Sequence, residues 1–510
     1  MKKIGMSILA ATALASTMAM AGGDIAPTNP QAEVSAVKSE VVKRKLKGDM
    51  VVEYNVLPGS TDSFTGMFQD GIFYGRLRSN SFYWDWDHET WNDIAKKGNL
   101  DNKNMGIGGS LIFKSSAFNG FSFTAGYYGS MNPDFWRLDA DEIAGAKAGK
   151  DTFSRYDVLK RGGYGGGMHV LGEAYLEYQN DMFDIKAGRQ LFESVFTASN
   201  DTKMIPNTFD GVTVAANIAD KTSARVAYFT EQKLRDHTSA HDVVTFKDEN
   251  GESWNNNDDS AVHKGLSYAN FLAAGEDPDH ELIVADIKTK IIPNLDATLS
   301  FLSVPGVVND IVAEAHYAVP FENGWTLRPG IRYFHQMDDG GGDVAGYTNL
   351  TGKAATGYDA GVADSLDSSL FAARVDMMMP EKKGFFRLGY SQIEDKADIV
   401  APWRGFPTGG FTRAMAQYNW YANTKTYMAR VAYKFTPEFD VSLRYAIQDF
   451  DDDKANVQAD SNVWHLDTVY KLTPNFYVKG RIGLVDADPD NTGKADVSYN
   501  EYRLEFNYLF

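Results

Sequence analysis

Segments of about ten residues with strictly alternating apolar and polar side chains dominate the chain. Because successive side chains of a strand point to opposite faces, such a segment has one apolar and one polar face. The chain ends on one of them, 501–510, with apolar side chains at every second position: Tyr502, Leu504, Phe506, Tyr508 and Phe510. The same pattern begins near residue 68 and predicts strands in 73–87, 183–190, 223–229, 309–319, 326–334, 369–378, 426–435, 440–448, 463–472 and 476–485.

The connections between these segments separate a membrane barrel from a soluble β-sandwich, which also alternates. Short turns such as 180–182 and 293–294 alternate along the chain with long polar stretches such as 129–168 and 231–280. Short turns at one end and long loops at the other are typical of an outer-membrane barrel. The pattern predicts an all-β fold, a transmembrane antiparallel β-barrel of roughly eighteen strands with short periplasmic turns and long extracellular loops. At that size the lumen is too wide for wall side chains to fill, which leaves an aqueous channel.

The amino-terminal residues predict export. Lys2 and Lys3 precede an apolar stretch and an Ala-x-Ala site, so residues 1–21 are predicted to be a signal peptide, with a retained membrane anchor as the alternative. Residues 22–60 are predicted to be a periplasmic leader, flexible or with a short helix over 34–41, and residues 61–510 to be the barrel. The predicted location is the outer membrane of a Gram-negative cell.

Composition supports export and excludes one class of partner. The chain has no cysteine, so no disulfide stabilises it, and 13% of its residues are aromatic. Its formal net charge is −18, which becomes −20 if Lys2 and Lys3 leave with the signal peptide. This acidity argues against nucleic acid as a partner.

Two motifs resemble the OprD-type (Opr family) outer-membrane porins. The stretch GRLRSNSFYWDWD at 75–87 is similar to that family's first strand. The stretch AGRQLFESVFTASNDTKMIPNTFDGV at 187–212 is similar to its fifth strand and third loop. The resemblance implies an eighteen-stranded, often trimeric channel whose third loop folds into the lumen. We therefore expect a homotrimer, with a monomer as the alternative.

An inward third loop explains the apolar content of 191–208. Its apolar residues are predicted to pack on the barrel wall: Phe192, Val195, Phe196, Ile205 and Phe209. That packing would hold Glu193, Asp201 and Lys203 in a constriction. An external loop with its own small apolar cluster is the alternative.

Basic residues recur on the parity of the strands that faces the lumen, because charges facing lipid would cost about 2–4 kcal/mol each near the midplane. A row of arginines can pass a carboxylate between bidentate sites, and the resemblance implies that such a ladder guides carboxylate-bearing solutes. The alternative is that these groups pair with acidic wall residues such as Asp376 and Asp467. The residues predicted to form the ladder are Arg328, Arg332, Arg374, Arg387, Arg430, Arg444, Arg481 and Arg503.

The loop at 395–424 is the predicted seventh loop, and the resemblance implies that it helps to narrow the pore. Arg404 and Arg413 are its candidate pore residues, with Trp403 and Phe411 as packing anchors. A simple surface cover is the alternative.

Other motifs carry weaker predictions. The glycine-rich 161–169 lacks the lysine and following helix of a phosphate-binding loop. Acidic clusters at 337–343 and 449–453 are predicted to face solvent or to bridge lipopolysaccharide through divalent ions. No cofactor is predicted apart from a weak candidate for structural calcium, spaced like the start of an EF-hand loop: Asp486, Asp488 and Asp490.

The sequence therefore predicts a porin, a passive channel for small hydrophilic solutes and ions that contacts membrane lipid and lipopolysaccharide. The alternative is a general non-selective porin that is also a structural or adhesive surface protein. An outer-membrane enzyme is a weaker hypothesis, because the nine histidines are scattered without a catalytic motif. An energised transporter would need a plug larger than residues 22–60.

Overall fold

The computed structural model describes residues 44–47, 51–54, 58–95, 98–147, 149–247, 265–345, 365–415, 420–451, 459–488 and 496–510. The predicted signal peptide and the predicted helix over 34–41 lie outside these residues. Within the predicted leader, β1 (Arg44–Lys47) and β2 (Val51–Tyr54) pair as an antiparallel hairpin. This part of the leader is therefore extended rather than helical, as the β-branched valines at the start of β2 favour.

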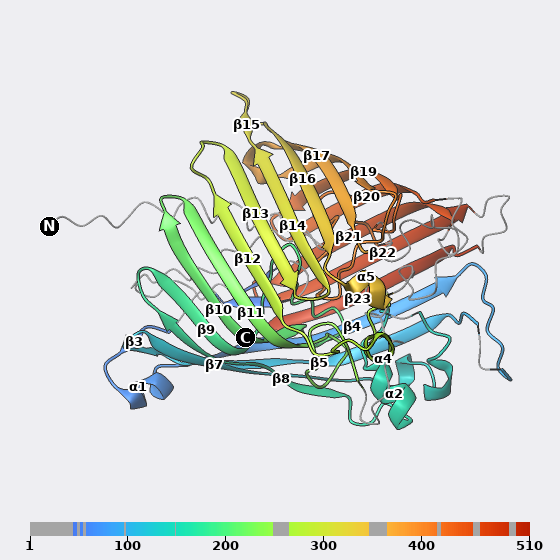
Figure 1. The fold of residues 1–510 in the computed structure, drawn as a ribbon, viewed down its shortest axis with the longest axis horizontal. Helices are drawn as coiled ribbons and strands as arrows, with labels where there is room; N and C mark the ends of the chain where they lie inside the picture. The colour runs from blue at the N-terminus through green and yellow to red at the C-terminus, as the bar shows by residue number, and fades with distance from the viewer. Residues whose placement is uncertain are drawn as a thin grey trace.

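The chain closes into an antiparallel barrel of 18 long strands, which confirms the predicted fold (Figure 1). The last strand, β23 (Tyr499–Leu509), pairs with the first long strand, β4 (Ile72–Trp86). The other long strands are β5 (Asn102–Lys114), β7 (Phe121–Met131), β8 (Met168–Gln179), β9 (Phe183–Gln190), β10 (Thr208–Ala219), β11 (Thr222–Lys233), β12 (Leu282–Thr289), β13 (Leu295–Val304), β14 (Val308–Tyr317), β16 (Thr326–Asp338), β17 (Ser368–Met378), β18 (Gly384–Ile393), β19 (Lys425–Thr436), β20 (Phe439–Asp449), β21 (Asp460–Thr473) and β22 (Phe476–Asp488).

The two ends of the barrel differ. We call them the turn end and the loop end. At the turn end lie three two-residue strands, a short helix and a 3-10 turn: β3 (Ser60–Thr61), β6 (Ala117–Phe118), β15 (Val319–Pro320), α1 (Phe64–Gln69) and η3 (Pro380–Lys382). The remaining short helices lie in the loops at the other end: η1 (Asp134–Trp136), η2 (Ala140–Glu142), α2 (Arg155–Arg161), α4 (Tyr268–Ala274) and α5 (Gly341–Ala345). Among the described residues no helix is long and apolar enough to cross a membrane.

Four of the loops matter for the lumen, and we number loops in chain order at the loop end. The connection between β9 and β10 is the third and that between β18 and β19 the seventh, as predicted. The loops used below are L2 (132–167), L3 (191–207), L4 (234–281) and L7 (394–424). The fifth loop, 305–307, is a tight turn and is much shorter than L2, L3, L4 or L7 at the same end of the barrel.

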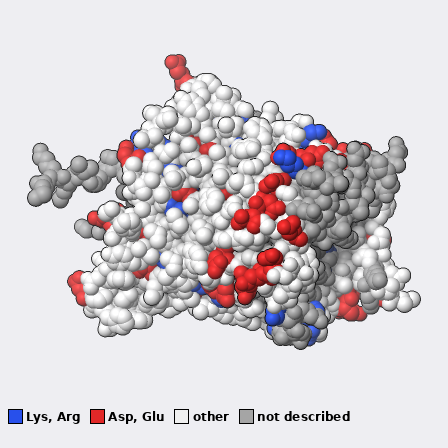
Figure 2. Space-filling view, in the orientation of Figure 1, with Lys and Arg blue, Asp and Glu red and all other residues white. Residues whose placement is uncertain are grey.

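The outer wall of the barrel is apolar. On β23 the residues of one parity are exposed on the outside, with 38–46% of their surface accessible: Tyr502, Leu504, Phe506 and Tyr508. The intervening Glu501, Glu505 and Asn507 are buried inside, which confirms the predicted alternation. Figure 2 shows a wall with few charges and acidic side chains gathered toward the loop end, where Asp279, Asp339 and Asp367 are exposed.

The largest apolar core lies inside the barrel rather than between sheets. It joins wall residues such as Phe229 and Leu302 to residues of the loops, including Val243 of L4 and Trp403 of L7. Since wall side chains cannot fill an 18-strand lumen, the inward loops supply the missing volume.

We expect Leu504→Arg to destabilise the barrel by about 2–4 kcal/mol, because Leu504 faces outward in the middle of the closing strand. Urea titration in lipid vesicles, followed by the gel shift of the folded barrel, measures this change. Glu322→Arg, in an exposed turn, is the matched control and should leave the midpoint within error. Equal stability of the two variants would contradict a lipid-facing position for Leu504.

Candidate functional site in the barrel lumen

L3 folds into the lumen, as its apolar residues predicted. Phe192 and Phe196 are buried in the main core, against wall residues of β11, β12 and β13. Phe209, which was expected to pack as part of the loop, is buried in the same core but belongs to β10. Ile205 is buried in a second cluster with Ile112 and neighbouring side chains of β5, β7 and β8. The loop is therefore packed on two separate parts of the barrel wall inside the lumen, and the external alternative is wrong.

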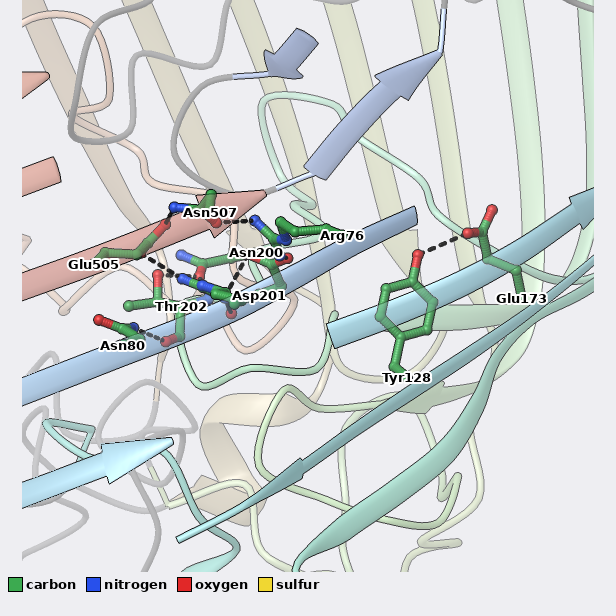
Figure 3. A network of polar contacts seen from close by, with 10 residues as sticks. Arg76, Asn80, Tyr128, Glu173, Asn200, Asp201, Thr202, Glu505 and Asn507 are labelled. Carbon is green, nitrogen blue, oxygen red and sulfur yellow. Dashed lines mark hydrogen bonds and ion pairs between the residues drawn. The ribbon is translucent and has the colours of Figure 1, made fainter. Parts of the chain in front are cut away.

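The tip of L3 is bound to the first barrel strand (Figure 3). Asp201 forms ion pairs with Arg76 and Arg78, and Arg78 Nη1 also donates to the Asp201 carbonyl at 2.7 Å. Arg78 Nη2 donates to Glu505 Oε2 at 2.7 Å, and Asn80 Nδ2 donates to the Thr202 carbonyl at 2.8 Å. Burial raises the pKa of Asp201, and the two guanidinium groups oppose that effect. Removing the Asp201 carboxylate would leave the buried Arg76 guanidinium without the acidic group with which it pairs.

Lys203 joins three loops. Its Nζ lies 2.5 Å from Asp151 Oδ1 of L2 and 3.2 Å from Asp236 Oδ2 of L4, and all three side chains are fully buried. The sequence predicted Lys203 but neither carboxylate. The alternating pattern of the strands does not predict a role for Asp151 or Asp236. Both reach Lys203 only because L2 and L4 also fold into the lumen.

L7 lies against L3 inside the barrel. Ala198 N donates to the Trp403 carbonyl at 3.1 Å, and Gly405 N donates to the Phe196 carbonyl at 2.9 Å. A Cβ on Gly405 would lie 2.1 Å from the Phe196 backbone, so only glycine allows this approach. The predicted residue Arg404 is buried at this junction with a φ of 70°.

The other residues predicted in L7 are also inside. Trp403 and Phe411 are each 1% exposed and belong to the main core, which confirms their role as packing anchors. The Arg413 guanidinium lies 3.1 Å from the centre of the Phe406 ring. L7 is therefore an inward loop rather than a surface cover.

Four of the predicted ladder arginines bind the backbone of L7. Arg332 Nη1 donates to the carbonyls of Pro407 and Gly409, at 2.7 and 3.0 Å. Arg374 and Arg387 both donate to the Gly410 carbonyl, the latter at 2.8 Å. Arg444 Nη1 donates to the Arg413 carbonyl at 2.9 Å.

The same arginines also pair with acidic wall residues, as the alternative interpretation of the ladder predicted. Arg332 binds Glu314, and Arg387 binds Asp376 through both carboxylate oxygens, at 2.6 and 3.0 Å. Asp467 accepts from Arg444 at 3.0 Å and from Arg481 at 2.8 Å. Arg503 pairs with Glu501. Much of the wall charge is thus neutralised locally.

Strand register nevertheless places basic residues in a row. Arg387, Arg430 and Arg444 lie directly opposite one another on β18, β19 and β20, and Arg481 lies opposite Arg503 on β22 and β23. Like charges in such positions repel. Arg328 is outside this row, near the turn end and paired with Asp296 at 2.7 Å.

Two cavities border the inward loops. The first, which we call cavity A, lies between β4, β21, β22, β23 and the tip of L3. Its ionisable lining is mainly basic: Arg78, Lys479, Arg481 and Arg503, with Asp467 and Glu505. The second, cavity B, lies between L3, L7 and the wall of β12 to β16, and its charges balance: Lys288 and Arg332, with Asp286 and Glu314.

Other sequence candidates are not assembled into a site. Glu193 of L3 is half-buried, and its carbonyl accepts from Arg225 at 2.7 Å. Asp486 and Asp488 are exposed on β22 rather than in a calcium-binding loop, and Asp490 lies outside the described residues. Within the described ranges no group of three or more acidic, histidine or cysteine side chains is arranged to hold a metal.

The sequence analysis also missed a contact between L2 and the last strand. Lys150 of L2 is buried, and its Nζ donates to Glu501 Oε2 of β23 at 2.8 Å. Burial lowers the pKa of Lys150 to about 8. A lone lysine in a long polar loop gives no pattern that would have identified this contact.

Comparison with known proteins supports the fold. No protein-family model and no curated protein matches the chain. Solved structures do: OccAB1 of Acinetobacter baumannii has a TM-score of 0.65 at 15% identity, over 88% of this chain and 99% of that one. OccAB4 of the same organism has 0.62 at 16%, over 86% and 98%. OpdK of Pseudomonas aeruginosa, crystallised with vanillate, has 0.58 at 13%, over 86% and 98%.

These structural neighbours are outer-membrane porins of the OprD/Occ type. At such identities the similarity establishes a shared fold, and it confirms the structural resemblance that the motifs at 75–87 and 187–212 predicted.

We expect Lys203→Met to destabilise the protein by about 3–5 kcal/mol, because it removes the buried ammonium group that lies between the Asp151 and Asp236 carboxylates. Urea unfolding in lipid vesicles measures the loss, and limited proteolysis should detect looser packing of L2, L3 and L4. Lys160→Met, at an exposed position of L2, is the control. An unchanged unfolding midpoint for Lys203→Met would contradict a joining role for Lys203.

We also expect residues 234–247 of L4 to become less stably packed at acid pH. His241 is half-buried, with its Nε2 2.8 Å from His237 Nδ1, and its desolvation together with His237 lowers the pKa of His241 to about 3. A histidine whose folded pKa lies below its unfolded value of about 6.5 stabilises the fold above pH 6.5 and loses that contribution as pH falls toward 3.

The loss should reach about 1.4 kcal/mol per pH unit within this window. Hydrogen exchange of residues 234–247 at pH 7.5 and pH 4.5 measures it. In His241→Gln the acid-dependent increase in exchange should be smaller. An identical increase in both proteins would show that other groups control the loosening.

Proposed function

We propose that this protein is an outer-membrane porin through which small hydrophilic solutes and ions diffuse passively. The observation that carries the proposal is a closed 18-strand barrel with an apolar exterior and a charged interior. An apolar outer wall fits lipid, and a polar lumen of this width fits water and solutes. The similarity in fold to OprD/Occ-type porins supports the same assignment.

The inward loops favour a selective channel over a general porin. L3 and L7 meet inside the lumen, cavity B lies beside that junction, and cavity A lies at the tip of L3. A solute must pass close to charged wall residues at this level. Contact at such short range, in surroundings of low dielectric, lets charge discriminate between solutes.

The solutes we propose are small carboxylates. Four basic residues against two acidic ones line cavity A, so an anion there meets a net positive surface. Arginine binds a carboxylate through two parallel hydrogen bonds. OpdK, which shares the fold, was crystallised with vanillate, an aromatic carboxylate.

We also propose that the protein contacts lipopolysaccharide and assembles as a trimer. Exposed acidic residues at the loop end, including Asp339 and Asp367, could bind lipopolysaccharide through divalent cations. A trimer remains our expectation for the assembly.

Purified protein in planar lipid bilayers should give ohmic single-channel steps. The measurement is made on the folded form, identified by its gel shift before heating. Folded protein that never conducts in any monovalent salt would overturn the porin assignment.

Arg430, Arg481 and Arg503 are proposed to set the selectivity. Neutralising all three to Gln should shift the reversal potential in a salt gradient toward cation preference, since it removes positive charge from the narrow part of the lumen. Carboxylate flux should fall while the flux of a neutral sugar stays close to that of the unchanged protein.

Arg161→Gln, at an exposed position in L2, is the control for charge far from the constriction, where salt screens its effect. If the triple variant keeps its reversal potential while Glu193→Gln with Asp201→Asn shifts it, L3 rather than the arginine row controls selectivity.

A further inference from the structure

The arginines that hold L7 lie where an anionic solute would bind. Arg332, Arg374 and Arg387 come from three neighbouring strands and together bind the carbonyls of Pro407, Gly409 and Gly410. We call residues 407–410 the latch. Phe406 and Gly409 line cavity B, and so does Arg332. The cavity and the latch therefore share one guanidinium group.

The contacts of the latch are weaker than those a carboxylate would make. A backbone carbonyl is a neutral acceptor, and hydrogen bonds between two ionised groups are shorter and stronger. An anion that reaches Arg332 in cavity B can therefore compete with the Pro407 and Gly409 carbonyls for Nη1. Glu314 already binds the rest of that guanidinium group, so the carbonyl side is the one open to exchange.

The backbone of the latch suits movement. Gly409 and Gly410 carry no side chain that could anchor them, and Gly410 has a φ of 82°, which glycine adopts at little cost. A hydrogen bond flanks the segment on each side. Gly405 N donates to Phe196 of L3, and the Thr412 hydroxyl lies 2.6 Å from that of Ser391 on β18.

We propose that the latch is released by the solute: a carboxylate in cavity B replaces the Pro407 and Gly409 carbonyls on Arg332. This removes two of the four arginine contacts of the latch, and the weaker attachment at Gly410 that remains lets the latch move away from the wall. The passage beside L7 widens while the carboxylate is bound and narrows when it leaves. Phe411, whose ring lies 4.8 Å from the Arg332 guanidinium and 5.3 Å from that of Arg374, draws L7 back. This inference rests on the proposed porin function, because the solute must reach cavity B from water.

A disulfide staple tests the latch directly. The chain contains no cysteine, so Ser391→Cys with Thr412→Cys introduces a single pair, at hydroxyl positions close enough for an S–S bond. Single-channel current is recorded with chloride alone and after adding benzoate, before and after reduction by dithiothreitol. Reduced channels should show a benzoate-dependent rise in chloride current, and oxidised channels should lose that rise and pass benzoate about tenfold more slowly.

A second variant acts in the opposite direction and covers the case in which the staple fails to fold. Arg332→Lys keeps the charge but loses the planar fork that reaches two carbonyls at once. Its chloride current without benzoate should exceed that of the unchanged protein, and the benzoate-dependent rise should shrink. Arg161→Lys is the control, at an exposed position distant from L7 in sequence.

The outcomes separate this inference from the porin assignment. Channels that conduct but respond to benzoate equally when oxidised and reduced would overturn the latch and leave the porin intact. A current that Arg332→Lys leaves unchanged would also overturn the latch. Folded protein without any current would overturn both.

Discussion

Every backbone N–H and C=O group that is buried away from water needs a hydrogen-bond partner, and this constraint governs how a loop can occupy the lumen. L7 forms backbone hydrogen bonds within itself and to L3, but its carbonyls at Pro407, Gly409 and Gly410 accept from wall side chains. Arginine meets the need because it carries five donors and accepts nothing. Arg387, for example, binds Asp376 with one edge and the Gly410 carbonyl with another. The wall charges are therefore part of what keeps the loop inside.

That structural task limits what the same charges can do for solutes. Wall carboxylates such as Asp376, Asp467 and Glu314 lie among the arginines and neutralise them locally. What remains for a passing anion is a local excess of basic lining, as in cavity A, or a guanidinium nitrogen that donates to neutral carbonyls, as Nη1 of Arg332 does beside cavity B. Cavity A has more basic than acidic lining, whereas the charges of cavity B balance. The net negative charge of the whole chain does not predict the charge of either cavity.

The fold could be predicted because apolar side chains recur at every second position of the strands. Alternation in segments such as 501–510 sets which side chains face lipid, and the alternating lengths of the connections set the two ends. The third loop was also predictable, because Phe196 and Ile205 have no reason to be apolar in water. The contacts of Asp151, Asp236 and Lys150 were not predictable, since they arise where loops far apart in sequence meet, and no local pattern encodes such a meeting. The arginine row was predicted as a set, but its binding to L7 carbonyls depends on register and on the path of the loop.

The two inward loops are held by different chemistry, and this difference assigns them different roles. L3 is fixed by pairs of opposite full charges, Asp201 with Arg76 and Lys203 with Asp151, all buried. Breaking such a pair inside the lumen leaves a buried ion without its partner, so no solute can substitute cheaply there. L7 is held by charge against neutral carbonyls, and a solute carboxylate is the better acceptor for the same donors. L3 is therefore the rigid part of the constriction. L7 is the part that can move, because a solute can replace the hydrogen bonds that hold it.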